Sequence, residues 1–496
     1  MALRVAVLAA LACRLGAALA PTPRTPLTKL NAATMEPLVA ETDIAPPPAL
    51  ALRSSALRRL PGGGTAPTVW SEFGDLARRV DASGAFDGGV ANLGQGFPDW
   101  APPQFVKTAA RRAASDESPA GHQYARSAGH VPLVHVLARR YSNHIGRDVD
   151  ALSEVAVTVG ATQALLVSLL ATLAAGDEVV IPEPFFDLYL GQIKLAEGVA
   201  RPAPMAVDGD GEWRLTEDVL RGAITPKSRV LVVNSPHNPT GKVFDRDELE
   251  MIARVVREEN ARRERDRAGD EDDALLVIAD EVYKYITHDA DADHVHFASL
   301  PGMRDVTLTV SSAGKTFSAT GWQIGWIVGP ARLVAPCQTL LPYLQFCAPT
   351  PMQAALADCL DEADRPHKGQ PSYYAWLRVE YARKRQVLAA ALEAACIAPL
   401  PSRGGYFVVG DVSSLLPLVP DRYRRPNGDA VAADWAFCQW LAAEHGVVAI
   451  PASPFFTDAP ERPLVRFAFC KTDAVLAVAA ERLAAIAAMC QALPEG

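Results

Sequence analysis

Short apolar runs alternate with longer amphipathic segments through the middle of the chain. Each run is four or five residues long and ends in a loop of small residues, prolines or polar residues; the runs are 155–159, 178–181, 229–233, 274–278 and 306–310. Buried parallel strands joined by helices have this pattern, because both faces of such a sheet are covered. We therefore expect an α/β protein with a mostly parallel sheet sandwiched by helices.

The pattern changes in the last third of the chain. Strand-like and helical segments there predict a smaller α+β domain; the segments are 377–392, 404–411, 446–450, 463–469 and 473–489. We assign residues 107–344 to the large domain and residues 345–496 to the small one. Residues 69–106 are expected to form an N-terminal arm that belongs partly to the small domain.

The N-terminal segment differs in composition from the rest of the chain. Residues 1–35 contain arginines and a lysine but no acidic residue, and the apolar run 5–13 is too short to span a membrane. A signal peptide ending near Ala20 and an organelle transit peptide both fit this composition. We exclude residues 1–68 from the fold as a targeting leader, with mitochondrion or plastid as destination and cytoplasm or the secretory pathway as alternatives.

Composition narrows the classes of partner. The chain has 496 residues and a net charge of -9, which argues against nucleic acid or an anionic membrane as the main partner. Its eight cysteines include no CxxC pair, so we expect neither a zinc site nor a disulfide framework, and a reducing compartment is favoured.

Candidate chemistry lies where the predicted strands end. Ligands bind outside the carboxyl ends of the strands in parallel sheets. The polar residues at these ends are Asn234, Asn238, Asp280, Tyr283, Ser312 and Lys315. Lys315 is predicted on a small-residue loop, where burial would lower the pKa of its amine and allow attack on a carbonyl. The alternative is a lysine that only caps a turn.

Two further positions bear on the chemistry. Residues 160–163 join a strand to a helix, and small residues at a helix start can bind an anion through backbone N–H groups. A plain turn is the alternative reading. Arg466 lies in an apolar strand, where a buried guanidinium needs an anionic partner, either a substrate carboxylate or an internal acid.

Together these groups match what pyridoxal phosphate requires. That cofactor needs a lysine for a Schiff base, an acid beside its ring nitrogen and an anion site for its phosphate. The motifs at these positions resemble those of fold-type-I aminotransferases of class I/II, over residues 70–486. Within that class the chain is most similar to kynurenine aminotransferases, also known as cysteine-S-conjugate β-lyases or glutamine transaminase K. The motifs that carry the resemblance are 93–99, 183–186, 238–244, 280–283, 312–322 and 465–467.

The resemblance implies a role for each matching residue. Lys315 would be the Schiff-base lysine and proton shuttle, Asp280 would pair with the ring nitrogen, and Tyr283 and Asn238 would reach the ring oxygen. The implied cofactor-binding residues are Ala161, Thr162, Phe186, Asn238, Ser312, Gln323 and, from a neighbouring subunit, Tyr124. The implied substrate-binding residues are Arg466, Asn238, Gly96, Trp70 and Phe346.

Two departures from the family pattern affect the site. Gln323 stands where the family has a lysine or arginine that contacts the phosphate, which predicts weaker cofactor retention. Cys347 replaces a histidine and Thr162 a bulkier aromatic residue, which predicts a wider or less aromatic-selective pocket.

The resemblance also implies the activity. We expect a homodimeric enzyme that moves the amino group of kynurenine, glutamine, or an aromatic or sulfur amino acid to a 2-oxo acid. A β-eliminating lyase on the same cofactor is the main alternative. A regulatory protein without catalysis is a third reading, disfavoured because no basic or helix-turn-helix-like domain is present.

Overall fold

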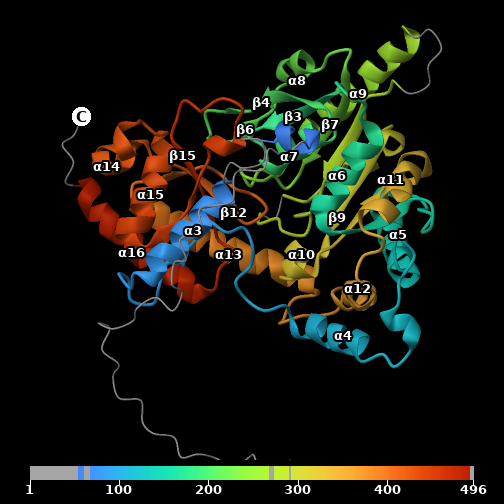
Figure 1. Ribbon diagram of the computed structural model, residues 1–496, viewed down its shortest axis with the longest axis horizontal. Coiled ribbons are helices and arrows are strands. Elements are labelled where there is room, and N and C mark those ends of the chain that lie inside the picture. Colours follow the sequence, from blue (N-terminus) through green and yellow to red (C-terminus); the bar gives the residue numbers. More distant parts are fainter. Residues whose placement is uncertain (1–53, 61–67, 267–272, 290–291, 492–496) are drawn as a thin grey trace, which may run out of the picture. The chain divides into compact units, whose positions relative to one another are not determined.

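A seven-stranded sheet organises the larger part of the molecule (Figure 1). The computed structural model describes residues 54–60, 68–266, 273–289 and 292–491. The strands lie in the order β2-β10-β9-β8-β7-β3-β4, and all neighbours are parallel except the pairs that include β10. Their bounds are β2 Val155–Val159, β3 Glu178–Glu183, β4 Val199–Pro204, β7 Ser228–Asn234, β8 Leu276–Asp280, β9 Thr307–Ser312 and β10 Ile324–Val328.

All five strands predicted from apolar runs are present, and two further strands were missed. β4 contains Pro202 and Pro204, which argue against a strand in the sequence. Proline is tolerated there because β4 lies at the edge of the sheet, where a missing N–H breaks no ladder. β10 follows the motif at 312–322, contains Gly325, and runs antiparallel between β2 and β9.

Alternate residues of the strands point to the two faces of the sheet, and helices cover both. Val230, Val232 and Ile278 belong to one buried cluster, which includes residues of α6, α7 and α11. Leu231 and Val277 belong to the other, which includes residues of α5, α8 and α9. The helices are α5 Val131–Ile145, α6 Gly160–Thr172, α7 Leu188–Leu195, α8 Glu217–Ala223, α9 Arg246–Arg265 and α11 Ala331–Leu344.

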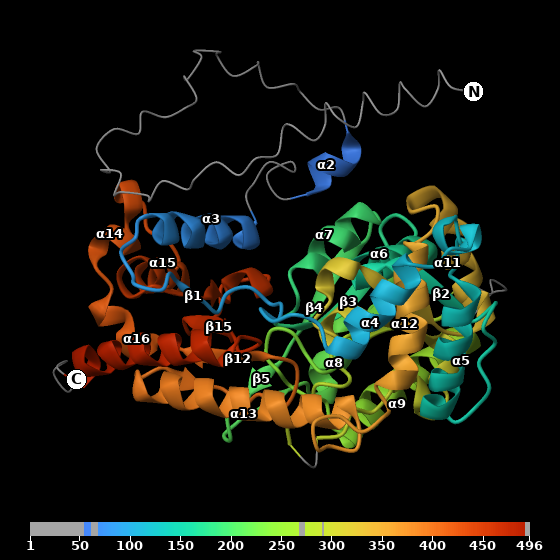
Figure 2. The ribbon, with the colours of Figure 1, turned by 90° about the horizontal axis from the view of Figure 1, so that it is seen from below.

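A second, antiparallel sheet forms in the C-terminal third, in the order β11-β12-β15-β14. Figure 2 shows α13 and α16 running along β12 and β15, with α3 beside α15. The strands are β11 Ala398–Pro399, β12 Phe407–Asp411, β14 Ile450–Pro451 and β15 Leu464–Ala468. The helices are α3 Val69–Ala82, α13 Tyr373–Ala394, α14 Asp421–Arg424, α15 Ala433–His445 and α16 Asp473–Gln491.

The N-terminal arm joins this second sheet region. β1 (Ala91–Asn92) pairs in parallel with β13 (Val447–Val448), and Phe73 of α3 is buried with its ring 5.4 Å from that of Trp435. α4 (Gln104–Ala114) instead packs against α12 (Thr350–Glu362), which also contacts α5. α12 therefore packs among the helices of the large sheet, although we assigned residues 345–496 to the small domain.

Three expectations need correction. Lys315 lies in a one-turn helix, α10 (Ala313–Thr316), and not in a loop. Part of the excluded leader is ordered: α2 (Ser55–Arg59) packs against α7, and Arg59 forms a 2.6 Å ion pair with Glu197. Cys396 and Cys490 form a disulfide, where the sequence predicted none. Their separation of 94 residues gives no sign of pairing, but the ends of α13 and α16 meet in space.

Most of the proposed leader lies outside the described residues, so its targeting role stays a prediction. α9 ends at Arg265, shortly before residues 267–272, which the structure does not describe. Among the helices that are described, none combines the length and apolar character needed to cross a membrane.

Candidate active site

Strand register brings the first candidate residues together. Asn234 and Asp280 are paired at the carboxyl ends of the adjacent parallel strands β7 and β8. The Asn234 side-chain amide donates to the Asp280 backbone carbonyl at 2.9 Å, and its oxygen accepts from the Asn238 backbone N–H at 2.8 Å. Asn234 thus fixes the start of the loop that carries Asn238.

Lys315 is aimed into the same region by α10, which begins where β9 ends. Its Nζ lies 3.5 Å from the Gly96 carbonyl oxygen, 5.8 Å from the Tyr283 ring centroid and 5.9 Å from that of Tyr406. Burial lowers the pKa of the Lys315 amine, and the nearby positive charge of Arg466 lowers it further. The amine is therefore more easily neutral than that of a surface lysine, which a nucleophile requires.

Asp280 is a buried carboxyl group at the end of β8. Its Oδ2 accepts from the Tyr189 hydroxyl at 2.6 Å and its Oδ1 from the Val282 backbone N–H at 3.3 Å. Burial raises the pKa of Asp280 to about 6, against the effect of these hydrogen bonds and of Lys315. A protonated ring nitrogen beside this group would favour its charged form.

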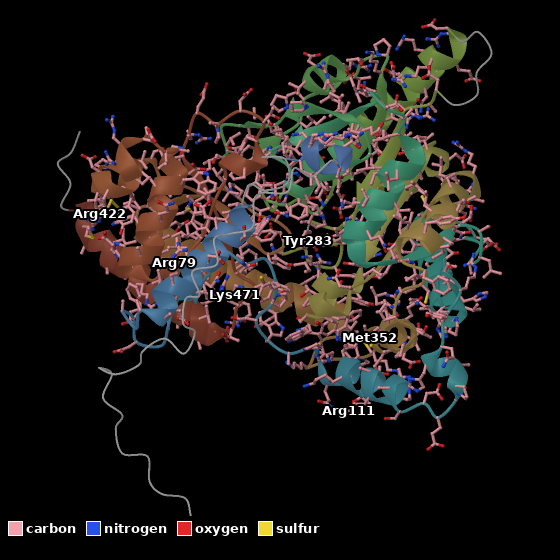
Figure 3. The ribbon with its side chains drawn as sticks, viewed as in Figure 1. Arg79, Arg111, Tyr283, Met352, Arg422 and Lys471 are labelled. Carbon is pink, nitrogen blue, oxygen red and sulfur yellow. A yellow bond between two sulfur atoms is a disulfide. The ribbon has the colours of Figure 1, made fainter. Side chains whose placement is uncertain are left out.

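Tyr283 lies where elements of the two sheets meet, as labelled in Figure 3. Its ring is buried and packs edge-on against that of Tyr406, with centroids 5.1 Å apart. The Tyr406 hydroxyl donates to the Gly96 carbonyl oxygen at 2.8 Å. A Cβ added to Gly96 would lie 2.8 Å from the Phe407 ring, so the close approach of this segment requires glycine.

Arg466 is the most deeply buried cation of the site, with 1% of its surface exposed. Its Nη1 donates to Asn238 Oδ1 at 3.1 Å and its Nη2 to the Gly94 carbonyl oxygen at 2.9 Å, while its Nε has no hydrogen-bond partner. Within the described residues, no carboxylate lies within 4.0 Å of the guanidinium. Burial lowers the pKa of Arg466 to about 10, which leaves it charged at neutral pH.

Aromatic rings surround this guanidinium. Its carbon lies 4.0 Å from the Phe407 ring centroid, 4.7 Å from that of Trp70 and 5.3 Å from that of Phe455. Such contacts stabilise a cation but supply no negative charge. The internal salt bridge that was one reading of Arg466 is therefore absent from the part of the chain that the structure describes.

The predicted anion site lies at the first turn of α6. Ala161 and Thr162 belong to this turn, and no side chain caps the helix start. Gly325 of β10 packs directly on it, since an added Cβ would lie 2.4 Å from the Gly160 carbonyl carbon. The Gln323 side chain is held beside Gly160 and donates to the Thr320 carbonyl oxygen at 2.6 Å.

Two other predicted residues flank this region. Ser312 pairs with Gly325 across β9 and β10, so it lies on the strand next to the α6 start. Phe186 is partly buried, with its ring 5.8 Å from that of Tyr189, the residue bonded to Asp280. Ser312 therefore lies next to the start of α6, and Phe186 lies next to the tyrosine that binds Asp280.

Tyr124 and Phe346 form a separate pair. Their rings lie 4.5 Å apart, and their exposed fractions are 78% and 54%. Within the described part of the chain, neither shares a hydrogen bond or ring contact with Trp70 or Arg466. The pocket-lining role expected of Phe346 is thus not reproduced by contacts within one chain.

Sequence reasoning missed three residues of the site. Tyr189 bonds Asp280, Tyr406 bonds Gly96, and the Asp187 carboxylate accepts from Trp70 Nε1 at 2.8 Å. Asp187 directly follows the motif at 183–186, and Tyr189 lies two residues further on. This closeness to the motif was the only sequence signal that pointed to these two residues.

Comparison with known proteins decides the family. The model of aminotransferase class I and II matches residues 89–483. The chain belongs to the class I and II aminotransferases. It is similar to kynurenine–oxoglutarate transaminase of Dictyostelium discoideum, with 36% identity over 84% of this chain and 93% of that protein. Kynurenine–oxoglutarate transaminase 1 of Rattus norvegicus is 37% identical over 84% of this chain and 94% of its own length.

A solved structure agrees with this assignment. N-succinyldiaminopimelate aminotransferase from Mycobacterium tuberculosis superposes with a TM-score of 0.73 at 35% identity, covering 88% of this chain and all of that one. The fold is therefore that of fold-type-I aminotransferases, and the protein is a pyridoxal-phosphate-dependent transaminase. The fold class, the enzyme class and the cofactor predicted from the sequence are confirmed.

The residues present fit this cofactor. Lys315 offers an amine with a lowered pKa. Asp280 offers a buried carboxylate, and each of its oxygens accepts one hydrogen bond within the protein and can accept another. The uncapped start of α6 offers backbone N–H groups to a phosphate. Gln323 adds no charge there, so the phosphate site has one formal positive charge fewer than the family pattern implies.

We predict that Gln323→Lys tightens the binding of pyridoxal phosphate by about tenfold at low ionic strength. An ammonium placed beside the α6 start would attract the phosphate, and added salt should weaken the gain because the position is exposed. The dissociation constant is measured by spectral titration of the apoenzyme. Gln104→Lys adds the same charge on the exposed face of α4 and serves as control. Equal dissociation constants for Gln323→Lys and the wild type would refute the prediction.

Proposed function

We propose that this aminotransferase takes the amino group from a kynurenine, glutamine, aromatic or sulfur-containing L-amino acid and passes it to a 2-oxo acid. One observation carries the proposal: a buried Arg466 without a carboxylate partner among the described residues, enclosed by Trp70, Phe407 and Phe455. A substrate carboxylate would supply the missing negative charge, and the rings would accept an apolar or aromatic side chain. The names of the two transaminase relatives support kynurenine as one such donor.

Each residue of the site has a task in this proposal. Arg466 binds the substrate carboxylate, with Asn238 holding the guanidinium in place and Gly96 allowing a close approach. Bound pyridoxal phosphate, covalently held by Lys315, would supply an electron-withdrawing ring that makes the substrate α-proton acidic. The Lys315 amine would take that proton and hold it for return to the reacting group, a role favoured by its lowered pKa.

The other residues hold charge and orientation. Asp280 would hold the ring nitrogen with its carboxylate, and Tyr189 keeps that carboxylate in position. Tyr283 and Asn238 would hold the ring oxygen with a hydroxyl and an amide, and Phe186 would support the ring. Ser312, Ala161 and Thr162 would hold the phosphate from the end of β9 and the start of α6.

The donor class is tested with a panel of L-amino acids and 2-oxo acids on the holoenzyme. We expect amino-group exchange with kynurenine, glutamine, phenylalanine and methionine. A β-lyase would instead release pyruvate and ammonia from a cysteine S-conjugate, so both products are measured by mass spectrometry. Release of pyruvate and ammonia without any amino-acid exchange would overturn the transaminase proposal.

We also propose a homodimer that completes the site. Tyr124, Tyr343, Leu344 and Phe346 are large side chains that are 43% to 87% exposed in the single chain. Burial of such side chains between subunits is favourable, and a C2 interface would bring Tyr124 and Phe346 to the partner's site.

We predict that Phe346→Glu weakens the dimer and lowers activity at dilute protein, because a carboxylate in an apolar interface is costly. Sedimentation velocity measures the subunit equilibrium, and Val379→Glu on the exposed face of α13 is the control. A wild-type protein that sediments as a monomer at micromolar concentration would contradict the dimer.

A further inference from the structure

Asp187 has an unusual environment for a carboxylate. It immediately precedes α7, and its Oδ2 accepts a 2.8 Å hydrogen bond from Trp70 Nε1. Its Oδ1 is also buried and has no hydrogen-bond partner of good geometry. Burial raises the pKa of this carboxyl group, and the Trp70 hydrogen bond, Arg466 and the backbone N–H groups of Asp187 and Leu188 lower it. A buried carboxylate oxygen without a partner is costly, so one left in place within a binding site calls for an explanation.

Trp70 connects this carboxylate to the substrate-binding arginine. The edge of its indole ring donates to Asp187, and its face lies 4.7 Å from the Arg466 guanidinium carbon. Arg466 acts electrostatically on Asp187, but the two are further apart than the 4.0 Å of an ion pair. A cation and an anion therefore lie near one indole, each with an unpartnered buried atom, Arg466 Nε and Asp187 Oδ1.

These two groups impose different requirements on a substrate. Arg466 attracts one carboxylate, which every amino acid and 2-oxo acid carries. Asp187 repels a second carboxylate through its charge, whereas a neutral side chain such as an amide meets no such repulsion. Discrimination by a repulsive group needs no extra contact with the favoured substrate.

We propose that Asp187 is a specificity-determining residue: its negative charge, held beside the Trp70 indole, rejects substrate side chains that end in a carboxylate and tolerates neutral ones. This inference rests on the proposed function of the same site, in particular on Arg466 as the carboxylate-binding group. It applies equally to acceptors, so 2-oxo acids without a second carboxylate should react faster than 2-oxoglutarate.

Three donors of similar length isolate the effect: glutamine, glutamate and methionine end in an amide, a carboxylate and a thioether. We expect Asp187→Asn holoenzyme to raise the glutamate-to-glutamine ratio of kcat/KM by about tenfold or more, because it removes one charge and keeps the shape. The kcat/KM for methionine, whose side chain is uncharged, reports any general loss of activity in the variant. An unchanged glutamate-to-glutamine ratio, with methionine still transaminated, would overturn the inference.

A purely structural role for Asp187, orienting Trp70, makes a different prediction. Trp70→Phe removes the N–H donor but keeps the Asp187 charge. We expect its glutamate-to-glutamine ratio to stay within about twofold of the wild-type ratio. If Trp70→Phe instead reproduces the ratio of Asp187→Asn, the effect belongs to the indole and the inference fails.

Binding provides a readout that does not depend on turnover. Glutarate and its monoamide, glutaramate, are analogues of glutamate and glutamine that lack the amino group, and their dissociation constants follow from tryptophan fluorescence. We expect the wild type to bind glutaramate more tightly than glutarate and Asp187→Asn to lose most of this difference. Equal affinities in the wild type would overturn the inference, whereas failure to exchange amino groups with all three donors would refute the proposed function instead.

Discussion

The parallel register of β7, β8 and β9 is the constraint on which the site depends. It places the ends of the three strands at one edge of the sheet, so that Asn234 lies opposite Asp280 and β9 leads directly into Lys315. A shift of one residue between β7 and β8 would turn Asp280 to the opposite face and separate it from Tyr189.

The second, antiparallel sheet supplies the buried cation of the site. β15 presents Arg466 between β12 and β14, and the segment before it brings the Phe455 ring to the guanidinium. The amine and carboxylate that act on the cofactor thus come from one sheet, and the cation that binds the substrate comes from the other. Asn238 joins them, because its backbone is tied to Asn234 and its side chain to Arg466.

Much of this arrangement could be predicted from the sequence. Apolar runs located the five parallel strands, and the rule that ligands bind at strand ends selected Asp280, Asn238 and Lys315. β10 and β4 could not be found in this way, since glycine or proline interrupts their pattern. Asp187 and Tyr189 were missed because their importance depends on partners more than 90 residues away, which local periodicity does not reveal. The Cys396–Cys490 disulfide was missed for the same reason.

The central claim is that Lys315 carries the cofactor. The most direct measurement is reduction of the holoenzyme with borohydride, which makes the covalent link permanent, followed by peptide mass spectrometry. We expect the mass of the reduced cofactor on Lys315, within the peptide that contains it, and on no other lysine. A reduced cofactor found on Lys284, Lys471 or any lysine other than Lys315, or an unmodified Lys315 peptide from fully loaded enzyme, would contradict it.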